Sequence, residues 1–231
     1  MESLSEYLEK KHYIVFKNEI LLKEAFTHSS YVNEHRLTVI KDNERLEFLG
    51  DAVLEVAVSD FLFKRYPEHP EGILTRMRSA IVRETSLYRF AIENRFDQYV
   101  QLGKGEEAMD GRRRASLLAD LFEAFLGALY LDQGMPAVES FLSGTVFPQI
   151  EAGVFSHGMD FKTELQEYLQ RNGEVTIQYS LISESGPAHQ KEFTVEVEAE
   201  GHVLGTGTGK SKKMAEQHAA ENALTQLKDK E

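Results

Sequence analysis

The chain has 231 residues, more than a typical domain of about 100 to 150, so its length predicts two domains. It carries 38 acidic and 26 basic side chains, and the net charge of −12 excludes a general basic surface for nucleic acid. It has no cysteine and no apolar run of about 20 residues, which excludes thiolate sites and membrane-spanning helices. The first residues lack the pattern of a cleaved signal peptide, so a cytoplasmic location without a membrane partner is expected.

The segment from residue 1 to about residue 150 has the pattern of an all-helical domain. Apolar residues recur there at spacings of three and four, the period of an amphipathic helix, and no strand alternation is found. Turn signals such as Tyr66-Pro67 and Gln133-Gly134-Met135-Pro136 separate the helical stretches. Residues 151–159 contain two glycines and little periodicity, which predicts a linker.

An acidic stripe is expected on the helix around residues 44–55. Its carboxylates follow one another at steps of three, four and four, which places them on one helical face: Glu44, Glu47, Asp51 and Glu55. Like charges at these spacings repel by roughly 0.2–0.5 kcal/mol per pair in an isolated helix. A bound cation would offset this repulsion, although a solvated acidic face is the alternative interpretation.

A second pair of carboxylates, Asp120 and Glu123, lies in the apolar stretch 117–129, which predicts a buried helix. Buried carboxylates are costly unless they are paired or bind a metal. Oxygen ligands without a histidine or cysteine pattern indicate Mg²⁺, with Mn²⁺ as a substitute, rather than zinc. Such an ion suits phosphoryl chemistry. The alternative is that Asp120 pairs with an arginine such as Arg113.

The remaining segment, residues 160–229, changes to a mixed pattern. A helix is expected over 161–171, followed by strands at 175–183, 192–199 and 202–207 and a helix opened by Ser211. In the second strand, Phe193, Val195, Val197 and Ala199 share one face. The predicted order is α-β-β-β-α, a small α+β domain.

The stretch from Gly205 to Ser211, GTGTGKS, imitates a nucleotide-binding P-loop. The P-loop spacing requires a glycine where this chain has Leu204, and the surrounding order is not βαβ. No nucleotide cofactor is therefore expected. The histidines show no metal-binding spacing, so His28, His35 and His218 are interpreted as structural or surface residues.

The stretch from Asn43 to Leu54, NERLEFLGDAVL, resembles the signature of bacterial ribonuclease III. Other landmarks of this family match in order: Thr27-His28-Ser29-Ser30-Tyr31, Glu71-Gly72 and Asp120-Leu121-Phe122-Glu123-Ala124. The resemblance covers essentially the whole chain. It implies an all-α endonuclease domain over 1–150, a linker over 151–159 and a double-stranded-RNA-binding domain over 160–229.

The resemblance also implies an activity. The expected reaction is Mg²⁺-dependent hydrolysis of phosphodiester bonds in double-stranded RNA by a homodimer, leaving 5′-phosphate and 3′-hydroxyl ends with a short 3′ overhang. Processing of rRNA, mRNA and other RNA precursors and RNA turnover are the expected roles. Two alternatives remain. One is a protein that binds double-stranded RNA without cutting, and the other is a helical metal-dependent phosphohydrolase for small nucleotides.

Residue roles are carried over from the same resemblance. Glu47, Asp120 and Glu123 are the expected metal ligands, and Asp51 and Glu123 the expected catalytic residues. Glu44 and Glu71 are expected along the substrate cleft. Phe48 is expected to anchor the dimer in the partner subunit, with core packing as its alternative.

Three regions of the second domain match RNA-contact surfaces. They contribute Thr163, Gln166 and Glu167 from the opening helix, His189 from a turn, and Lys210, Lys212 and Lys213 at the start of the last helix. A helix N-terminus favours anions, and the lysines supply the local basic cluster that the acidic chain otherwise lacks.

Overall fold

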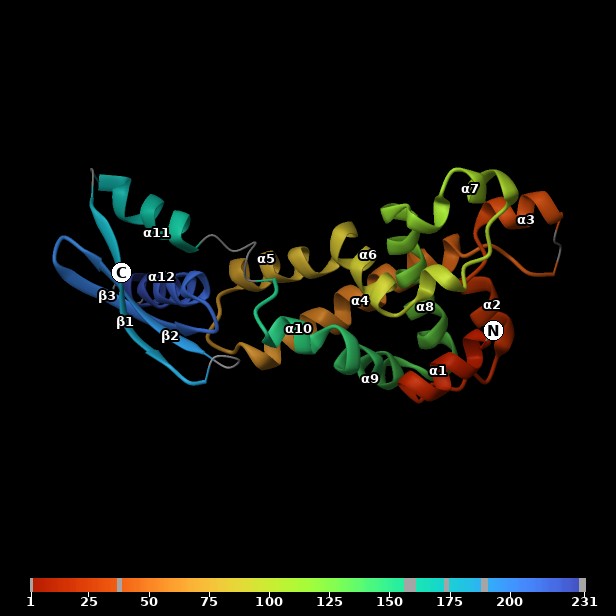
Figure 1. Cartoon of the computed structure of the whole chain (residues 1–231), viewed down its shortest axis with the longest axis horizontal. Coiled ribbons are helices and arrows are strands. Elements are labelled where there is room, and N and C mark those ends of the chain that lie inside the picture. Colours follow the sequence, from red (N-terminus) through yellow and green to blue (C-terminus); the bar gives the residue numbers. More distant parts are fainter. Residues whose placement is uncertain (1, 37–38, 156–160, 173–174, 188–190, 229–231) are drawn as a thin grey trace. The chain divides into compact units, whose positions relative to one another are not determined.

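The structure is a computed structural model that describes residues 2–36, 39–155, 161–172, 175–187 and 191–228 (Figure 1). The chain separates into two compact units, Met1–Ala152 and Gly153–Glu231. No helix in the described ranges is both long and apolar enough to cross a membrane.

The first unit is helical. Its helices are α1 (Leu4–His12), α2 (Glu19–Ala25), α3 (Ser29–His35), α4 (Glu44–Arg65), α5 (Glu71–Val82), α6 (Glu84–Glu93), α7 (Lys104–Ala108), α8 (Ala115–Gln133), α9 (Met135–Thr145) and α10 (Phe147–Glu151). Short 3-10 turns occupy Phe96–Gln98 and Gly111–Arg113. An isolated bridge joins Thr27 and Gln101. The prediction of an all-helical segment is confirmed.

The helix ends follow local sequence signals. Ser3 and Glu6 form a capping box at the start of α1, in which each side chain accepts a hydrogen bond from the backbone of the other. At the far end of α8, the chain turns at Gly134, whose φ of 79° suits glycine, and Pro136 lies in the first turn of α9. The predicted turn at 133–136 therefore separates two helices.

Helix α8 is the centre of the first unit and contacts α2, α4, α6 and α9 (Figure 1). Its buried side chains include Phe122 and Phe125, whose rings pack against Phe96 and Phe141. Burial of aromatic side chains of this size dominates the energy of a core. The prediction that residues 117–129 form a buried helix is confirmed.

Helices α4 and α8 approach closely because a glycine of each faces the other. A Cβ on Gly50 would lie 1.8 Å from the carbonyl oxygen of Glu123, and a Cβ on Gly127 would lie 2.2 Å from that of Leu46. No larger residue fits at either position without moving a backbone. The crossing therefore brings the predicted carboxylates of the two helices to the same place.

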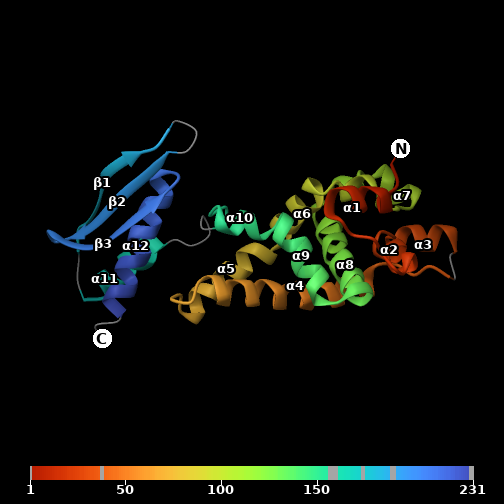
Figure 2. The ribbon, with the colours of Figure 1, turned by 90° about the horizontal axis from the view of Figure 1, so that it is seen from below.

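The second unit has the predicted α-β-β-β-α order. Its elements are α11 (Phe161–Leu169), a 3-10 turn (Gln170–Asn172), β1 (Ile177–Ser185), β2 (Glu192–Ala199), β3 (His202–Gly209) and α12 (Lys212–Lys228). The strands form an antiparallel sheet in the order β1-β2-β3, and α12 packs on β2, β3 and α11 (Figure 2). Strand β1 begins and ends two residues later than predicted, and β3 extends two residues further.

The glycines of the P-loop-like stretch are packing positions. A Cβ on Gly205, Gly207 or Gly209 would lie 2.2 to 2.7 Å from a backbone nitrogen of α12. The helix presents small residues to this strand, Ala215, Ala219 and Ala223, all of them buried. The glycine repeat therefore lets a helix lie against β3, which is a different use from cradling phosphates.

Candidate metal centre and nucleic-acid interface

Three of the predicted metal ligands come together at the crossing of α4 and α8. Glu47 of α4 and Asp120 and Glu123 of α8 each offer a carboxylate oxygen, and these oxygens lie within 4.8 Å of one another. All three side chains are half-buried. The spacing of three between Asp120 and Glu123 places both on the side of α8 that faces α4.

Burial and mutual repulsion make Glu123 the most perturbed acid of the group. Its removal from water raises its pKa to about 8, helped by the charges of Asp51, Asp120, Glu47 and Glu55. Burial also raises the pKa of Glu47, with Asp120, Glu44 and Asp51 adding to the shift. The cluster therefore holds more negative charge than its surroundings stabilise.

No lysine or arginine forms an ion pair with these three carboxylates within the described ranges. Arg113, the alternative partner of Asp120, lies instead 3.9 Å from Asp110. That alternative is wrong. A divalent cation at the cluster would supply the missing positive charge, and a set of carboxylate oxygens is the donor set that Mg²⁺ and Mn²⁺ prefer.

Asp51 lies one turn after Glu47 on α4 and is exposed. It is outside the three-carboxylate group, yet its charge is the largest electrostatic contribution to the raised pKa of Glu123. The structure therefore places Asp51 beside the cluster, on its solvent side.

Three charged residues outside the predicted site also influence the cluster. Burial raises the pKa of Asp120, the charge of Glu84 adds to the shift, and those of Arg114 and His28 oppose it. Glu84 begins α6 and Arg114 precedes α8. No spacing in the sequence connects these residues to the acidic stripe, because they come from separate elements.

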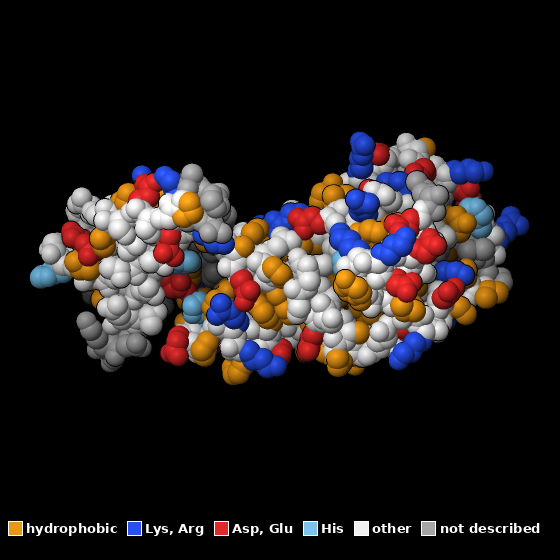
Figure 3. All heavy atoms as spheres, turned by 60° about the horizontal axis from the view of Figure 1, so that its bottom comes forward, with side chains coloured by type: hydrophobic (Ala, Val, Ile, Leu, Met, Phe, Trp, Pro, Cys, Tyr) orange, Lys and Arg blue, Asp and Glu red, His pale blue; other side chains and the backbone are white. Residues whose placement is uncertain are grey.

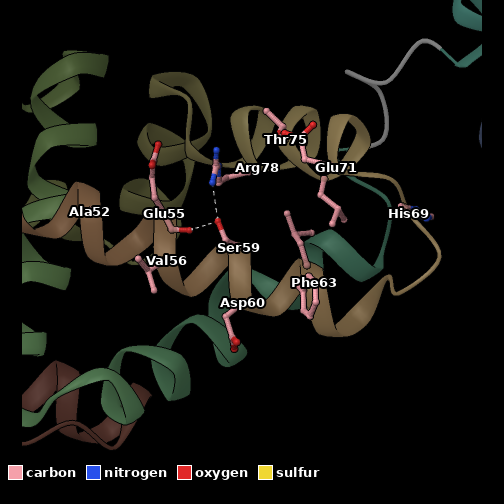
Figure 4. A pocket seen from close by; sticks show the side chains of 12 residues that line it. Ala52, Glu55, Val56, Ser59, Asp60, Phe63, His69, Glu71, Thr75 and Arg78 are labelled. Atoms are coloured by element: carbon pink, nitrogen blue, oxygen red, sulfur yellow. Dashed lines mark hydrogen bonds between the residues drawn. The ribbon is translucent and has the colours of Figure 1, made fainter.

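The two predicted cleft residues are not members of the three-carboxylate group, although the charge of Glu44 contributes to the raised pKa of Glu47. Glu44 is exposed at the first position of α4, and Glu71 is exposed at the first position of α5, where its Oε1 accepts a hydrogen bond of 2.9 Å from Thr75. Glu71 and Glu55 line a hollow of about 780 Å³ between α4 and α5 (Figure 4).

Phe48 is 82% exposed on α4, so its alternative role in the core is wrong. Two more apolar side chains of the same helix, Val56 and Phe63, are 58% and 72% exposed. Spacings of eight and seven residues bring these three side chains close to one helical face. Val56 and Phe63 also line the hollow in Figure 4. This exposed apolar face is unusual for a helix of a monomeric domain.

The predicted RNA-contact residues are exposed where the structure describes them. Thr163, Gln166 and Glu167 lie on α11, and Lys210, Lys212 and Lys213 surround the start of α12. The Oγ of Ser211 accepts a hydrogen bond of 3.2 Å from the Met214 nitrogen and so caps α12, as predicted. His189 lies outside the described residues.

The surface of the first unit is mixed in charge. On the face that Figure 3 shows, its lysine and arginine side chains are interspersed with aspartate and glutamate. In the second unit, the three lysines at the start of α12 form a local basic cluster. Because the net charge of the chain is −12, a phosphate-binding surface has to be a local cluster of this kind.

Comparisons with known proteins cover both units. A family model described as Ribonuclease-III-like matches residues 18–150, and one described as Double-stranded RNA binding motif matches residues 161–227. Ribonuclease 3 of Enterococcus faecalis is 61% identical over 224 residues, which cover 97% of each chain. Ribonuclease 3 of Streptococcus thermophilus is 58% identical over 227 residues, 98% of this chain and 99% of that one.

A solved structure resembles the first unit. It is the nuclease domain of ribonuclease III from Campylobacter jejuni, which aligns with a TM-score of 0.55 and 34% sequence identity. The alignment covers 60% of this chain and 92% of that one, and the structure was described for flexibility in a region involved in dimer formation.

Proposed function

The chain belongs to the ribonuclease III family and is an endoribonuclease for double-stranded RNA, and we propose that Glu47, Asp120 and Glu123 hold Mg²⁺ at its cleavage site. The observation that carries the proposal is the meeting of three half-buried carboxylates, within 4.8 Å, from two helices. Mg²⁺ bound there supplies an activated water and stabilises charge on the attacking and leaving oxygens of a phosphodiester.

The protein's own residues orient the reactants. Asp51, on the solvent side of the cluster, accepts a hydrogen bond from the attacking water and aims it at the phosphorus. Glu123 would bind the ion in its deprotonated form, so it would be both a metal ligand and a catalytic residue. Glu44 and Glu71 line the path of the RNA strand. Hydrolysis leaves 5′-phosphate and 3′-hydroxyl ends.

The second unit binds the RNA duplex. Lys210, Lys212 and Lys213 bind phosphates at the N-terminus of α12, where backbone N–H groups and the helix dipole also favour anions. Thr163, Gln166 and Glu167 of α11, with His189, contact the minor groove. Such modules read A-form shape and 2′-hydroxyl groups over about 16 base pairs, largely without sequence specificity.

The working unit is a homodimer. Phe48, 82% exposed, inserts into the apolar hollow of about 780 Å³ on the other copy, where Val56, Phe63 and Leu74 form the walls. A two-fold axis makes this contact twice, because each copy offers both the ring and the hollow. Two centres then face the two strands of one duplex, which gives the short 3′ overhang.

The biological role follows from the substrate. Structured precursors of rRNA and mRNA contain the duplexes that this chain cuts, so processing and turnover of RNA in the cytoplasm are its proposed roles. The proposed domain limits are 1–150 for the endonuclease, 151–159 for the linker and 160–229 for the RNA-binding domain. Mn²⁺ can replace Mg²⁺, because both ions prefer oxygen ligands.

Cleavage of a defined duplex tests the proposal. The full chain is incubated with a labelled RNA duplex of about 30 base pairs, long enough for the 16 base pairs that one module covers, with Mg²⁺ or with EDTA. We expect short duplexes with 5′-phosphates and 3′ overhangs in Mg²⁺ only. Binding without products would indicate the non-cleaving alternative. Hydrolysis of free nucleotides without preference for the duplex would indicate the small-molecule phosphohydrolase.

A further inference from the structure

A separate hollow of about 520 Å³ is formed by helices that carry none of the three clustered carboxylates. Helices α1, α6, α9 and α10 contribute its walls, which include Lys11, His12, Tyr13, Glu93, Asn94 and Phe141. Its volume is within the range of small-ligand pockets, roughly 300–1,000 Å³. Apolar walls with a few convergent polar groups are also typical of such pockets.

Two hydrogen-bond acceptors lie next to each other at the end of α6. Asn94 is 2% exposed, and its Nδ2 donates to the carbonyl oxygen of Phe90 at 2.8 Å, which fixes the amide. Within the described ranges, no donor is found for its Oδ1. The carboxylate of Glu93 accepts at Oε2 from Gln149 at 2.7 Å, so lone pairs remain on it. A ligand with two neighbouring N–H groups would satisfy both residues.

One cation lies beside these acceptors. Lys11 Nζ donates to the backbone carbonyl oxygen of Glu93 at 3.0 Å, which leaves two further N–H groups for a ligand. His12 adds no charge at neutral pH, because burial lowers its pKa to about 4 and the charge of Lys11 adds to the shift. The charges of Lys11 and Glu93 therefore balance, and the hollow suits an uncharged polar group better than an anion.

Aromatic rings supply the apolar part of the hollow. The ring centroids of His12 and Phe141 are 5.0 Å apart. Tyr13 ends α1 with a left-handed φ of 58°, where glycine is usual, and is 90% exposed. A bulky side chain in this conformation, with its ring in solvent, gains little from packing within its own chain. A flat ligand stacked on the ring would give the position a function.

We propose that this hollow binds the guanine base of a free nucleotide, with Glu93 and Asn94 accepting from its N–H groups and Lys11 donating to its carbonyl oxygen. Guanine presents two neighbouring donors, N1–H and the N2 amino group, beside the acceptor O6. Adenine and cytosine would turn a ring nitrogen lone pair toward the carboxylate, and uracil offers a single donor. The site is independent of the proposed Mg²⁺ centre.

Equilibrium dialysis of the full chain against radiolabelled GMP, AMP, CMP and UMP tests the site. EDTA is present, so that nucleotide phosphates cannot bind through a metal ion. We expect one GMP per chain and binding of the other three nucleotides about 10-fold or more weakly, as for a well-formed pair of hydrogen bonds to a base. No binding of GMP, or equal binding of all four nucleotides, would overturn the proposal.

Two variants connect the binding to the hollow. Glu93→Gln should weaken GMP binding about 10-fold or more, because a charged acceptor is lost. Tyr13→Gly should also weaken it while melting no lower than the wild type, because glycine suits the left-handed backbone. Glu139→Gln, the same change on α9 outside the lining, is the control and should bind GMP like the wild type.

Wild-type affinity for GMP in Glu93→Gln would overturn the assignment of this hollow. A single-stranded RNA with one guanine presents the same base edge and is dialysed in parallel. Binding of this RNA that depends on Glu93, without binding of GMP, would show that the base comes from RNA and would overturn the free nucleotide as the ligand.

Discussion

Gly50 of α4 and Gly127 of α8 face each other across the helix crossing, and a Cβ on Gly50 would lie 3.0 Å from the Gly127 nitrogen. The reciprocal distance, from a Cβ on Gly127 to the Gly50 nitrogen, would be 3.1 Å. Each glycine lies within four residues of metal ligands on its own helix, Glu47 and Glu123. The close approach of two backbones therefore sets the distance between the carboxylates.

Gly50→Ala should destabilise the first unit and abolish cleavage. The new methyl group would meet the carbonyl of Glu123 at 1.8 Å, and this backbone atom cannot move aside as a side chain would. Overpacking of this kind typically lowers the free energy of unfolding by about 1–3 kcal/mol, and we expect a loss at or above the upper end of this range. Urea denaturation of the variant measures it.

Gly144→Ala in α9 is the matched control, because a Cβ there meets nothing within 4 Å. Replacing a helical glycine by alanine, where the methyl group meets no other atom, stabilises the folded protein by roughly 0.5–1 kcal/mol. A Gly50→Ala variant as stable and as active as Gly144→Ala would refute the role of the two glycines at the crossing.

The metal-free protein should lose stability as the pH rises. Because the folded-state pKa of Glu123 is raised from 4.5 to about 8, the folded state keeps a proton that the unfolded chain releases. The stabilisation from this proton is complete below pH 4.5 and is lost as the pH rises through 8. Calorimetry in EDTA should show Tm falling over this window, and Mg²⁺ should restore it at the alkaline end.

Glu123→Gln should flatten this pH dependence, because an amide does not titrate. Glu47 and Asp120, whose pKa values are also raised, leave a smaller dependence of the same sign. A Tm that rises with pH in EDTA would contradict the assigned direction.

Replacing Lys212 and Lys213 together by alanine should weaken binding of RNA duplexes of any sequence. Both side chains are exposed at the start of α12, so the substitutions remove phosphate-binding groups without opening a core. The slope of log Kd against log salt should fall by about one for each phosphate that is no longer neutralised. Filter binding at several salt concentrations measures it, with Lys10→Ala in the first unit as the control. An unchanged slope would mean that other residues neutralise the phosphates.

Phe48→Ala should convert the dimer into a monomer. The ring is 82% exposed and has no place in the core of its own copy, so its removal leaves the fold unchanged. Sedimentation velocity, with melting temperature as the check on folding, distinguishes the states. Val15→Ala, at a residue that is 61% exposed and precedes α2, is the control. A dimer that persists in Phe48→Ala would exclude Phe48 as its anchor.

Much of this organisation could be predicted from the sequence, because periodicity reports local structure. The apolar stretch 117–129 predicted a buried helix, and alternation from Phe193 to Ala199 predicted β2. The influence of Glu84 and His28 on Asp120 could not be predicted, because it depends on the tertiary packing of separate elements. The use of Gly205 as a packing position for α12 was likewise visible only in three dimensions.

The most direct test of the proposed centre compares the wild type with Glu123→Gln on one RNA duplex at saturating Mg²⁺. Single-turnover cleavage and duplex affinity are measured together, with Glu139→Gln on the exposed side of α9 as the matched control. We predict unchanged affinity and a loss of at least about 100-fold in rate for Glu123→Gln. A Glu123→Gln variant that cuts as fast as the wild type would contradict the proposed centre.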